Sequence, residues 1–105
     1  MDNKENIIEK VRIYKDLVKS LFPVKIENVY LFGSYAKGTP HKDSDIDVAL
    51  VVRHLDENYS IWDTEPLLWK IGRQVDFRIS PVVVALDTDY TGFYDEIQQT
   101  GILIN

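Results

Sequence analysis

The chain has 105 residues, a formal net charge of −5 from 12 basic and 17 acidic side chains, and no cysteine. This length predicts one domain, residues 1–105, and the acidic balance argues against a long nucleic acid as a partner. Disulfides and thiolate zinc sites are excluded, and no segment reaches the ~18 apolar residues of a membrane span, so we expect a cytoplasmic protein without membrane attachment.

The chain begins with a predicted helix and a predicted short strand. Residues 3–21 carry apolar side chains at helical spacing with Lys and Glu between them, and Pro23 closes the segment. Residues 29–32 are apolar and aromatic and are followed by Gly33, which predicts a short buried strand.

A polar loop and a second strand follow. Residues 34–44 are polar and contain Gly38 and Pro40, which predicts a turn or short helix and then a loop. Residues 45–52 give the strongest strand signal, and the half after Asp47 is fully apolar. Such a strand is typical of a central position in a sheet, covered on both faces.

The next two elements are predicted as a helix and a third strand. Residues 62–73 have apolar side chains on one helical face, with Pro66 inside the first turn. Over residues 74–80 apolar side chains alternate with Asp76 and Arg78, which predicts a strand.

The last part of the chain adds a helix and an edge strand. Residues 81–86 are rich in β-branched side chains but begin with a proline, so the sequence does not decide their secondary structure. Residues 94–100 are predicted as a helix stopped by Gly101, and residues 102–104 as an edge strand. Strands that alternate with helices predict an α/β or α+β fold, with a small mixed β-sheet flanked by helices.

The segment between the first two strands carries the strongest functional signal. Gly33 ends the first strand and Ser34 begins a predicted short helix; after ten intervening residues, Asp-Ile-Asp opens the second strand. Glycine lets backbone N–H groups approach a phosphate, and Ser34 supplies a hydroxyl. Lys37, one turn further on, can pair with phosphate as a point charge, and Lys42 is either a second contact or a solvated side chain.

Two carboxylates at this point of a strand predict a metal site. Side chains alternate along a strand, so Asp45 and Asp47 point to one face with Cα atoms roughly 6.5 Å apart. They repel each other unless a cation intervenes, and Mg²⁺ prefers carboxylates together with substrate phosphates. Asp76, from the predicted third strand, is the expected third ligand. Three carboxylates can hold two Mg²⁺ ions that clamp the attacking and leaving oxygens of a phosphoryl displacement.

Other polar residues are interpreted as structural. Asp87-Thr88-Asp89 repeats the Asp-x-Asp pattern without a Gly-Ser pair at matching distance, and is interpreted as a solvated turn. His41 and His54 lack a second histidine at ligand spacing and are placed on the surface. For Asp76 the alternative is an ion pair with Arg78.

The motifs together resemble a known family. Gly33 to Gly38, Ser44 to Asp47, and Val75-Asp76 are similar to the minimal nucleotidyltransferases of the DNA polymerase β superfamily. Their signature is Gly-Ser, about ten residues, Asp-x-Asp and a third carboxylate on a later strand. The resemblance covers most of the chain and implies the polymerase-β-like nucleotidyltransferase fold. It also implies transfer of a nucleoside monophosphate, AMP from ATP by preference, to a hydroxyl with Mg²⁺.

The resemblance assigns roles residue by residue. Gly33 and Ser34 match the triphosphate-binding turn, while Asp45 and Asp47 match the metal ligands. Asp76 matches the third carboxylate, which can also act as base toward the acceptor hydroxyl. Lys37 stands where the family often has a basic residue, commonly Arg.

The resemblance also implies a partner. Small members of the family are often encoded beside a helical HEPN-domain protein, and adenylylate a tyrosine of that toxin, so that they act as antitoxins. Two other functions remain open: a binding module that neutralises its partner by contact, and a transferase acting on a small molecule such as an antibiotic. We expect an apolar partner surface on the side where the carboxylates open, including the helix with Trp62 and Trp69; core packing is the alternative for both tryptophans.

Overall fold

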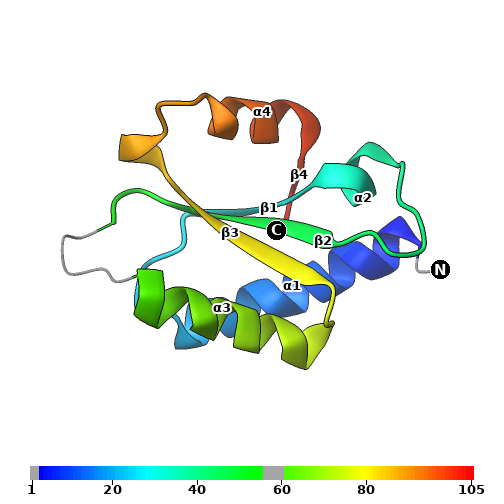
Figure 1. The fold of residues 1–105 in the computed structure, drawn as a ribbon, viewed down its shortest axis with the longest axis horizontal. Helices are drawn as coiled ribbons and strands as arrows, with labels where there is room; N and C mark the ends of the chain where they lie inside the picture. The colour runs from blue at the N-terminus through cyan, green and yellow to red at the C-terminus, as the bar shows by residue number, and fades with distance from the viewer. Residues whose placement is uncertain (1–2, 56–60) are drawn as a thin grey trace.

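The computed structural model describes residues 3–55 and 61–105, and for residues 61–63 it describes the backbone alone. A four-stranded sheet forms the middle layer, helices α1 and α3 cover one face, and α4 covers the other (Figure 1). In chain order the elements are α1 (Lys4–Leu21), β1 (Asn28–Phe32), α2 (Gly33–Lys37), β2 (Ile46–Val52), α3 (Ile61–Val75), β3 (Ile79–Ala85), the 3₁₀ turn η1 (Leu86–Thr88), α4 (Phe93–Thr100) and β4 (Ile102–Leu103).

The sheet is mixed, as predicted. Its strand order is β3-β2-β1-β4, with β1 antiparallel to both β2 and β4, and β2 parallel to β3. The parallel pair requires a crossover, and α3 supplies it. Strand β2, whose apolar half predicted a central position, is buried from Val48 to Val52 and pairs on both sides.

The alternation of side chains along the strands divides the core in two. Even-numbered residues of β2 face α1 and α3, whereas Asp47 and the odd-numbered residues after it face α4. The larger cluster has Ile7, Val11, Tyr14, Val18, Leu31, Ile46, Val48, Leu50, Leu68, Ile71 and Ile79 among its buried members. The smaller cluster contains Tyr30, Ala49, Val51, Val84 and Ile97, with Phe32, Val82, Phe93 and Tyr94 packed against it.

The first helix forms as the sequence predicts. It begins after Asn3, whose side-chain oxygen accepts a hydrogen bond from the Asn6 N–H at 2.8 Å and satisfies one free donor of the first turn. Its buried stripe packs on the sheet, and the Tyr14 hydroxyl donates to the Leu68 carbonyl of α3 at 3.0 Å. Helices α1 and α3 are thereby joined into one layer.

The third strand is present, but the bounds predicted for it, residues 74–80, are wrong for residues 74–78. Helix α3 continues to Val75, residues 76–78 form a turn, and β3 runs from Ile79 to Ala85. Val75 extends the apolar helical stripe of α3 and packs on the larger core, which favours helix over strand there. Pro81 is tolerated because β3 is the edge strand and pairs on one side alone.

No helix within the described ranges has both the length and the apolar character needed to cross a membrane.

Candidate active site

The candidate site lies where β1 ends, α2 begins and β2 starts. Because β1 and β2 are antiparallel, the last residue of β1, Phe32, is the register partner of Asp47 near the start of β2. Gly33 and Ser34 follow Phe32 directly as the first residues of α2. The fold therefore brings the Gly-Ser pair and the Asp-x-Asp pair together, as the spacing predicted.

Gly33 is in close contact with the carboxylate of Asp47. Its φ is +74°, in the left-handed region that disfavours side chains, and a Cβ atom added there would overlap Asp47 Oδ2. Glycine is thus required twice, for the turn from β1 into α2 and for the space that the carboxylate occupies. The Asp47 carboxylate therefore lies against the backbone at the first residue of α2.

The two carboxylates of the pair affect each other. Asp45 precedes β2 and is exposed, whereas Asp47 is half-buried on the α4 face. Burial raises the pKa of Asp47, and the nearby Asp45 charge raises it further. In the part of the chain that the structure describes, neither carboxylate has an ion-pair partner. Two unpaired, repelling carboxylates are a donor set that suits a divalent cation.

A short turn before β2 places Asp45. The buried Ser44 accepts a hydrogen bond from the His41 N–H at 2.8 Å through its hydroxyl, and its own N–H donates to the His41 carbonyl at 3.0 Å. This reciprocal pair closes the turn, so Ser44 and the backbone of His41 position the Asp-x-Asp pair. Sequence reasoning missed this role of Ser44, for which burial was the missing information.

Ser34, Lys37 and Lys42 lie where the sequence placed them, at α2 and in the loop after it. Ser34 is half-buried, and Lys37, in the last turn of α2, is exposed, as is Lys42. Gly38 ends the helix with a φ of +75°. The contacts of these three residues with a nucleotide remain a prediction.

Asp76 forms ion pairs with two basic side chains. It follows α3 in the turn before β3, and its Oδ2 accepts from Lys10 Nζ of α1 at 2.8 Å and from Arg78 Nη2 at 2.7 Å. Its Oδ1 accepts from the Arg78 side chain and backbone at 3.0 and 2.9 Å. These hydrogen bonds hold the pKa of Asp76 well below its usual range.

The structure places Asp76 in a turn and not at the expected strand position beside Asp47. Its two oxygens accept hydrogen bonds from Lys10 of α1 and from the backbone and side chain of Arg78 in the same turn. Within the described ranges there is no group of three or more His, Asp or Glu side chains placed to hold a metal ion. The alternative, an ion pair with Arg78, is what the structure shows, and Lys10 is the partner that sequence reasoning missed.

The ion-pair cluster around Asp76 also reaches α2. Arg78 Nη1 donates to the hydroxyl of Tyr35 at 3.0 Å, and Tyr35 is a buried residue of α2 that directly follows Ser34. Asp76 therefore orients Arg78, and Arg78 ties the turn before β3 to the helix that carries Ser34. This cluster is a support of the site and is assembled from three separate elements.

We expect Asp76→Asn to lower the free energy of unfolding by about 2 kcal/mol at pH 7, because it leaves Lys10 and Arg78 without their anion. Pairing lowers the folded-state pKa of Asp76, so its stabilisation is present above the unfolded pKa of about 3.9 and is lost as the pH falls below it. Urea unfolding at pH 7 and pH 3 measures the difference, which should shrink at pH 3. The exposed Asp16→Asn is the control; an equal loss in both variants would contradict the ion-pair role.

Comparison with known proteins agrees with this geometry. The family model described as polymerase beta, nucleotidyltransferase matches residues 5–105. The chain belongs to the polymerase beta nucleotidyltransferase family. A Methanocaldococcus jannaschii protein, provisionally named protein adenylyltransferase MJ0141, is 29% identical over 96 residues, or 91% of this chain and 96% of that protein.

Two further relatives of this nucleotidyltransferase are informative. Protein adenylyltransferase MntA of Shewanella oneidensis is 44% identical over 39 residues, which are 37% of this chain and 28% of MntA. A crystal structure of a "toxin-antitoxin with AMP-PNP" superposes with a TM-score of 0.64 at 29% identity, covering 91% of this chain and 72% of that one. The predicted fold and the resemblance to nucleotidyltransferases are confirmed.

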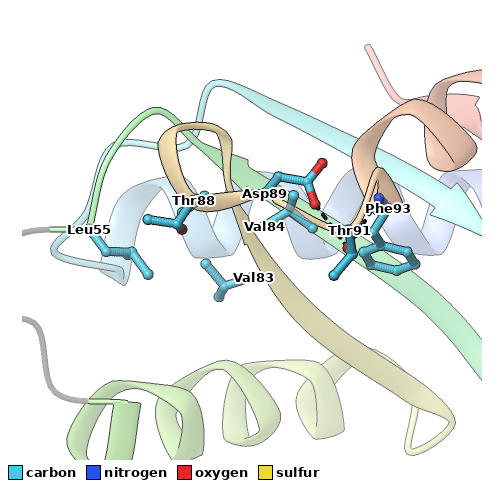
Figure 2. Close-up of a pocket in the computed structure, with 8 residues that line it drawn as sticks. Leu55, Val83, Val84, Thr88, Asp89, Thr91 and Phe93 are labelled. Atoms are coloured by element: carbon cyan, nitrogen blue, oxygen red, sulfur yellow. Dashed lines mark hydrogen bonds between the residues drawn. The ribbon is translucent and has the colours of Figure 1, made fainter.

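The second Asp-x-Asp segment of the nucleotidyltransferase has a structural role. Asp89 accepts hydrogen bonds from the Tyr94 N–H at 2.9 Å and the Thr91 hydroxyl at 3.3 Å, which orders the start of α4. Figure 2 shows Asp89 beside a shallow pocket at the far end of β3, lined by Leu55, Val83, Val84, Ala85, Thr88, Asp89, Thr91 and Phe93. Asp87 contacts the exposed His54. The pocket extends toward the carboxylate site, because the ring of Phe93, which lines it, packs edge-on against Phe32, the register partner of Asp47, with ring centroids 5.7 Å apart.

The helix with Trp62 and Trp69 does not lie on the side where the carboxylates open, which contradicts its expected place in a partner surface there. Helix α3 covers the face of the sheet opposite to Asp47, so it does not flank the side on which the Asp47 carboxylate lies (Figure 1). Trp69 on α3 is 39% exposed, and the Trp62 side chain lies outside the described residues. Phe77, expected inside a strand, is 83% exposed in the turn between Asp76 and Arg78.

Proposed function

We propose that this nucleotidyltransferase moves AMP from ATP to a hydroxyl of another protein in a Mg²⁺-dependent reaction, and acts as an antitoxin. The observation that carries the proposal is the unpaired Asp45 and Asp47 carboxylates beside the Gly33 turn. The names of the relatives, protein adenylyltransferase, and the toxin-antitoxin complex with AMP-PNP support the same reaction class. The proposed acceptor is a tyrosine of a small helical HEPN-type toxin.

The arrangement suits an in-line displacement at the α-phosphorus of ATP. Asp45 and Asp47 would hold the divalent cation, which would neutralise charge on the triphosphate. Gly33 lets the backbone of the α2 turn approach the phosphates, and Ser34 and Lys37 add a hydroxyl and a positive charge nearby. A bond forms from the acceptor oxygen to the α-phosphorus, the bond to pyrophosphate breaks, and the proton of the acceptor hydroxyl passes to solvent water.

We expect ATP to bind at least about tenfold more weakly in EDTA than with Mg²⁺, because Asp45, Asp47 and the triphosphate repel one another without a cation. Calorimetric titration of ATP under the two conditions measures the difference. In the Asp45→Asn/Asp47→Asn double variant the Mg²⁺ effect should shrink. If the unaltered chain bound ATP with equal affinity in EDTA and in Mg²⁺, the result would contradict a metal site at Asp45 and Asp47.

The proposed function is tested by co-expression with a HEPN-type toxin and incubation with Mg-ATP. We expect one tyrosine of the toxin to gain the mass of AMP by mass spectrometry, and the toxin to lose its activity. The Asp47→Asn variant is the matched control and should leave the toxin unmodified. A stable, inhibited complex without an AMP adduct would instead make this chain a binding module that acts by contact.

A further inference from the structure

Asp47 lies between two register partners in one row across the sheet. Phe32 of β1 is its partner on one side, and Ser80 of β3 is its partner on the other. Neighbouring strands are about 4.8 Å apart, and the side chains of register partners project to the same face. Ser80 is therefore the residue of β3 whose side chain lies next to the Asp47 carboxylate.

The burial of the neighbouring residues confirms which face Ser80 shares. Ile79, one residue earlier, is buried in the larger core toward α1 and α3, whereas Val82, two residues later, packs on the smaller core toward α4. Ser80 thus points to the α4 face together with Asp47. Its side chain is half-buried, and its hydroxyl has no hydrogen-bond partner in the described part of the chain.

The alternative acid, Asp76, lies toward the other face. Its oxygens accept from Lys10 of α1 and from Arg78, whose guanidinium also donates to Tyr35 in the larger core. Moving Asp76 to a metal beside Asp47 would strip a nearly buried carboxylate from both basic partners, which is strongly unfavourable. Of the two register partners of Asp47, Phe32 offers no oxygen and Ser80 offers one.

We infer that Ser80 occupies the third ligand position of this site, so that the chain offers a divalent cation two carboxylates and one neutral hydroxyl. This inference rests on the proposed metal-dependent function. Because affinity for a hard cation rises with the number of charged oxygen ligands, the site holds one ion with moderate affinity. A second ion must then be held largely by the triphosphate, and position 80 sets how tightly the site binds metal before nucleotide arrives.

Titration with Mn²⁺ in the absence of nucleotide tests the inference, with free Mn²⁺ measured by electron paramagnetic resonance. Because it completes a set of three carboxylates, we expect Ser80→Asp to tighten Mn²⁺ binding about tenfold. Ser80→Ala should weaken it by less than about threefold, since one neutral ligand is lost. Asp76→Asn should weaken it far less than Asp47→Asn does, because Asp76 supplies no ligand. Circular dichroism of each variant confirms that the fold is retained.

A second measurement uses the absence of cysteine from the chain. Ser80→Cys introduces a single thiol of nearly the same shape, and soft Cd²⁺ is bound by thiolate. We expect a thiolate-to-Cd²⁺ absorption band in the ultraviolet that saturates at one equivalent, and that is lost when Asp47→Asn is added. Ser20→Cys, at the exposed end of α1, is the matched control and should give no saturable band.

The outcomes separate this inference from the proposed function. If Asp47→Asn abolishes Mn²⁺ binding but Ser80→Asp leaves it unchanged and Ser80→Cys gives no Cd²⁺ band, the third-ligand role of Ser80 is overturned and the metal site stands. If Asp76→Asn weakens Mn²⁺ binding as much as Asp47→Asn does, Asp76 is the third ligand and the inference is overturned. If Asp47→Asn has no effect on Mn²⁺ or Mg-ATP binding, the proposed function itself is overturned.

Discussion

We expect Asp47→Asn to lower nucleotidyl transfer by about three orders of magnitude or more, because a metal ligand is lost at the point where transition-state charge is stabilised. The loss should appear in kcat more than in KM for the acceptor. Transfer of labelled AMP to the toxin, measured over time, gives the rate. Asp43→Asn, an exposed carboxylate in the preceding loop, is the control and should retain transfer.

The same substitution should not destabilise the metal-free protein. Burial and the charge of Asp45 raise the folded-state pKa of Asp47, so its ionised form is disfavoured by folding. A raised carboxyl pKa means that stability falls as the pH rises through that pKa, and the penalty persists at neutral pH. Asp47→Asn removes the charge, so its melting temperature should be equal to or above that of the unaltered chain at pH 7.

This stability comparison can contradict the metal-ligand role. The gain in melting temperature should vanish below about pH 3.9, where an unfolded Asp is also protonated. Mg-ATP should raise the melting temperature of the unaltered chain and have little effect on Asp47→Asn. A large drop in the melting temperature of metal-free Asp47→Asn at pH 7 would instead identify Asp47 as part of a structural ion pair.

We expect Gly33→Ala to abolish transfer nearly as completely, by at least about 10²-fold, because misplacing a catalytic group by about 1 Å has effects of that size. The added Cβ would overlap Asp47 Oδ2, so the carboxylate must rotate away from its position. The left-handed φ of +74° adds about 1–2 kcal/mol of backbone strain. The rate of AMP transfer and urea unfolding measure the two effects separately.

Gly38→Ala is the matched control for this prediction. Gly38 has nearly the same φ, +75°, but nothing lies within 4 Å of a Cβ added to it. It should therefore show the backbone strain without the displacement of Asp47, and lose stability with a much smaller loss of transfer. Equal loss of transfer in both alanine variants would assign the effect to α2 as a whole and not to the Gly33–Asp47 contact.

A double-mutant cycle adds a second control. Combined with Asp47→Ala, Gly33→Ala should destabilise the protein less than it does alone, because the side chain that it overlaps is gone. The remaining loss in the free energy of unfolding should match that of Gly38→Ala. Additive losses would mean that Gly33 and Asp47 do not interact in solution.

The sequence by itself determined the elements around Asp47. Helix α1, strand β1 and strand β2 follow from local periodicity, and the Gly-Ser and Asp-x-Asp pairs follow from their fixed spacing. Their proximity is also nearly local, because β1 and β2 are joined by a short helix and a loop and must pair as antiparallel neighbours. A motif that lies within one such connection can be interpreted before the rest of the fold is known.

The tertiary structure alone decided where Asp76 and Ser80 lie relative to Asp47. The chain around Asp76 alternates like a strand, but Val75 is drawn into the core as the last residue of α3, so β3 begins at Ile79. This shift makes Ser80 the register partner of Asp47, and Asp76 pairs instead with Lys10, which lies 66 residues away in the chain. Strand register and long-range ion pairs are set by packing between distant segments, and local periodicity contains no information about either.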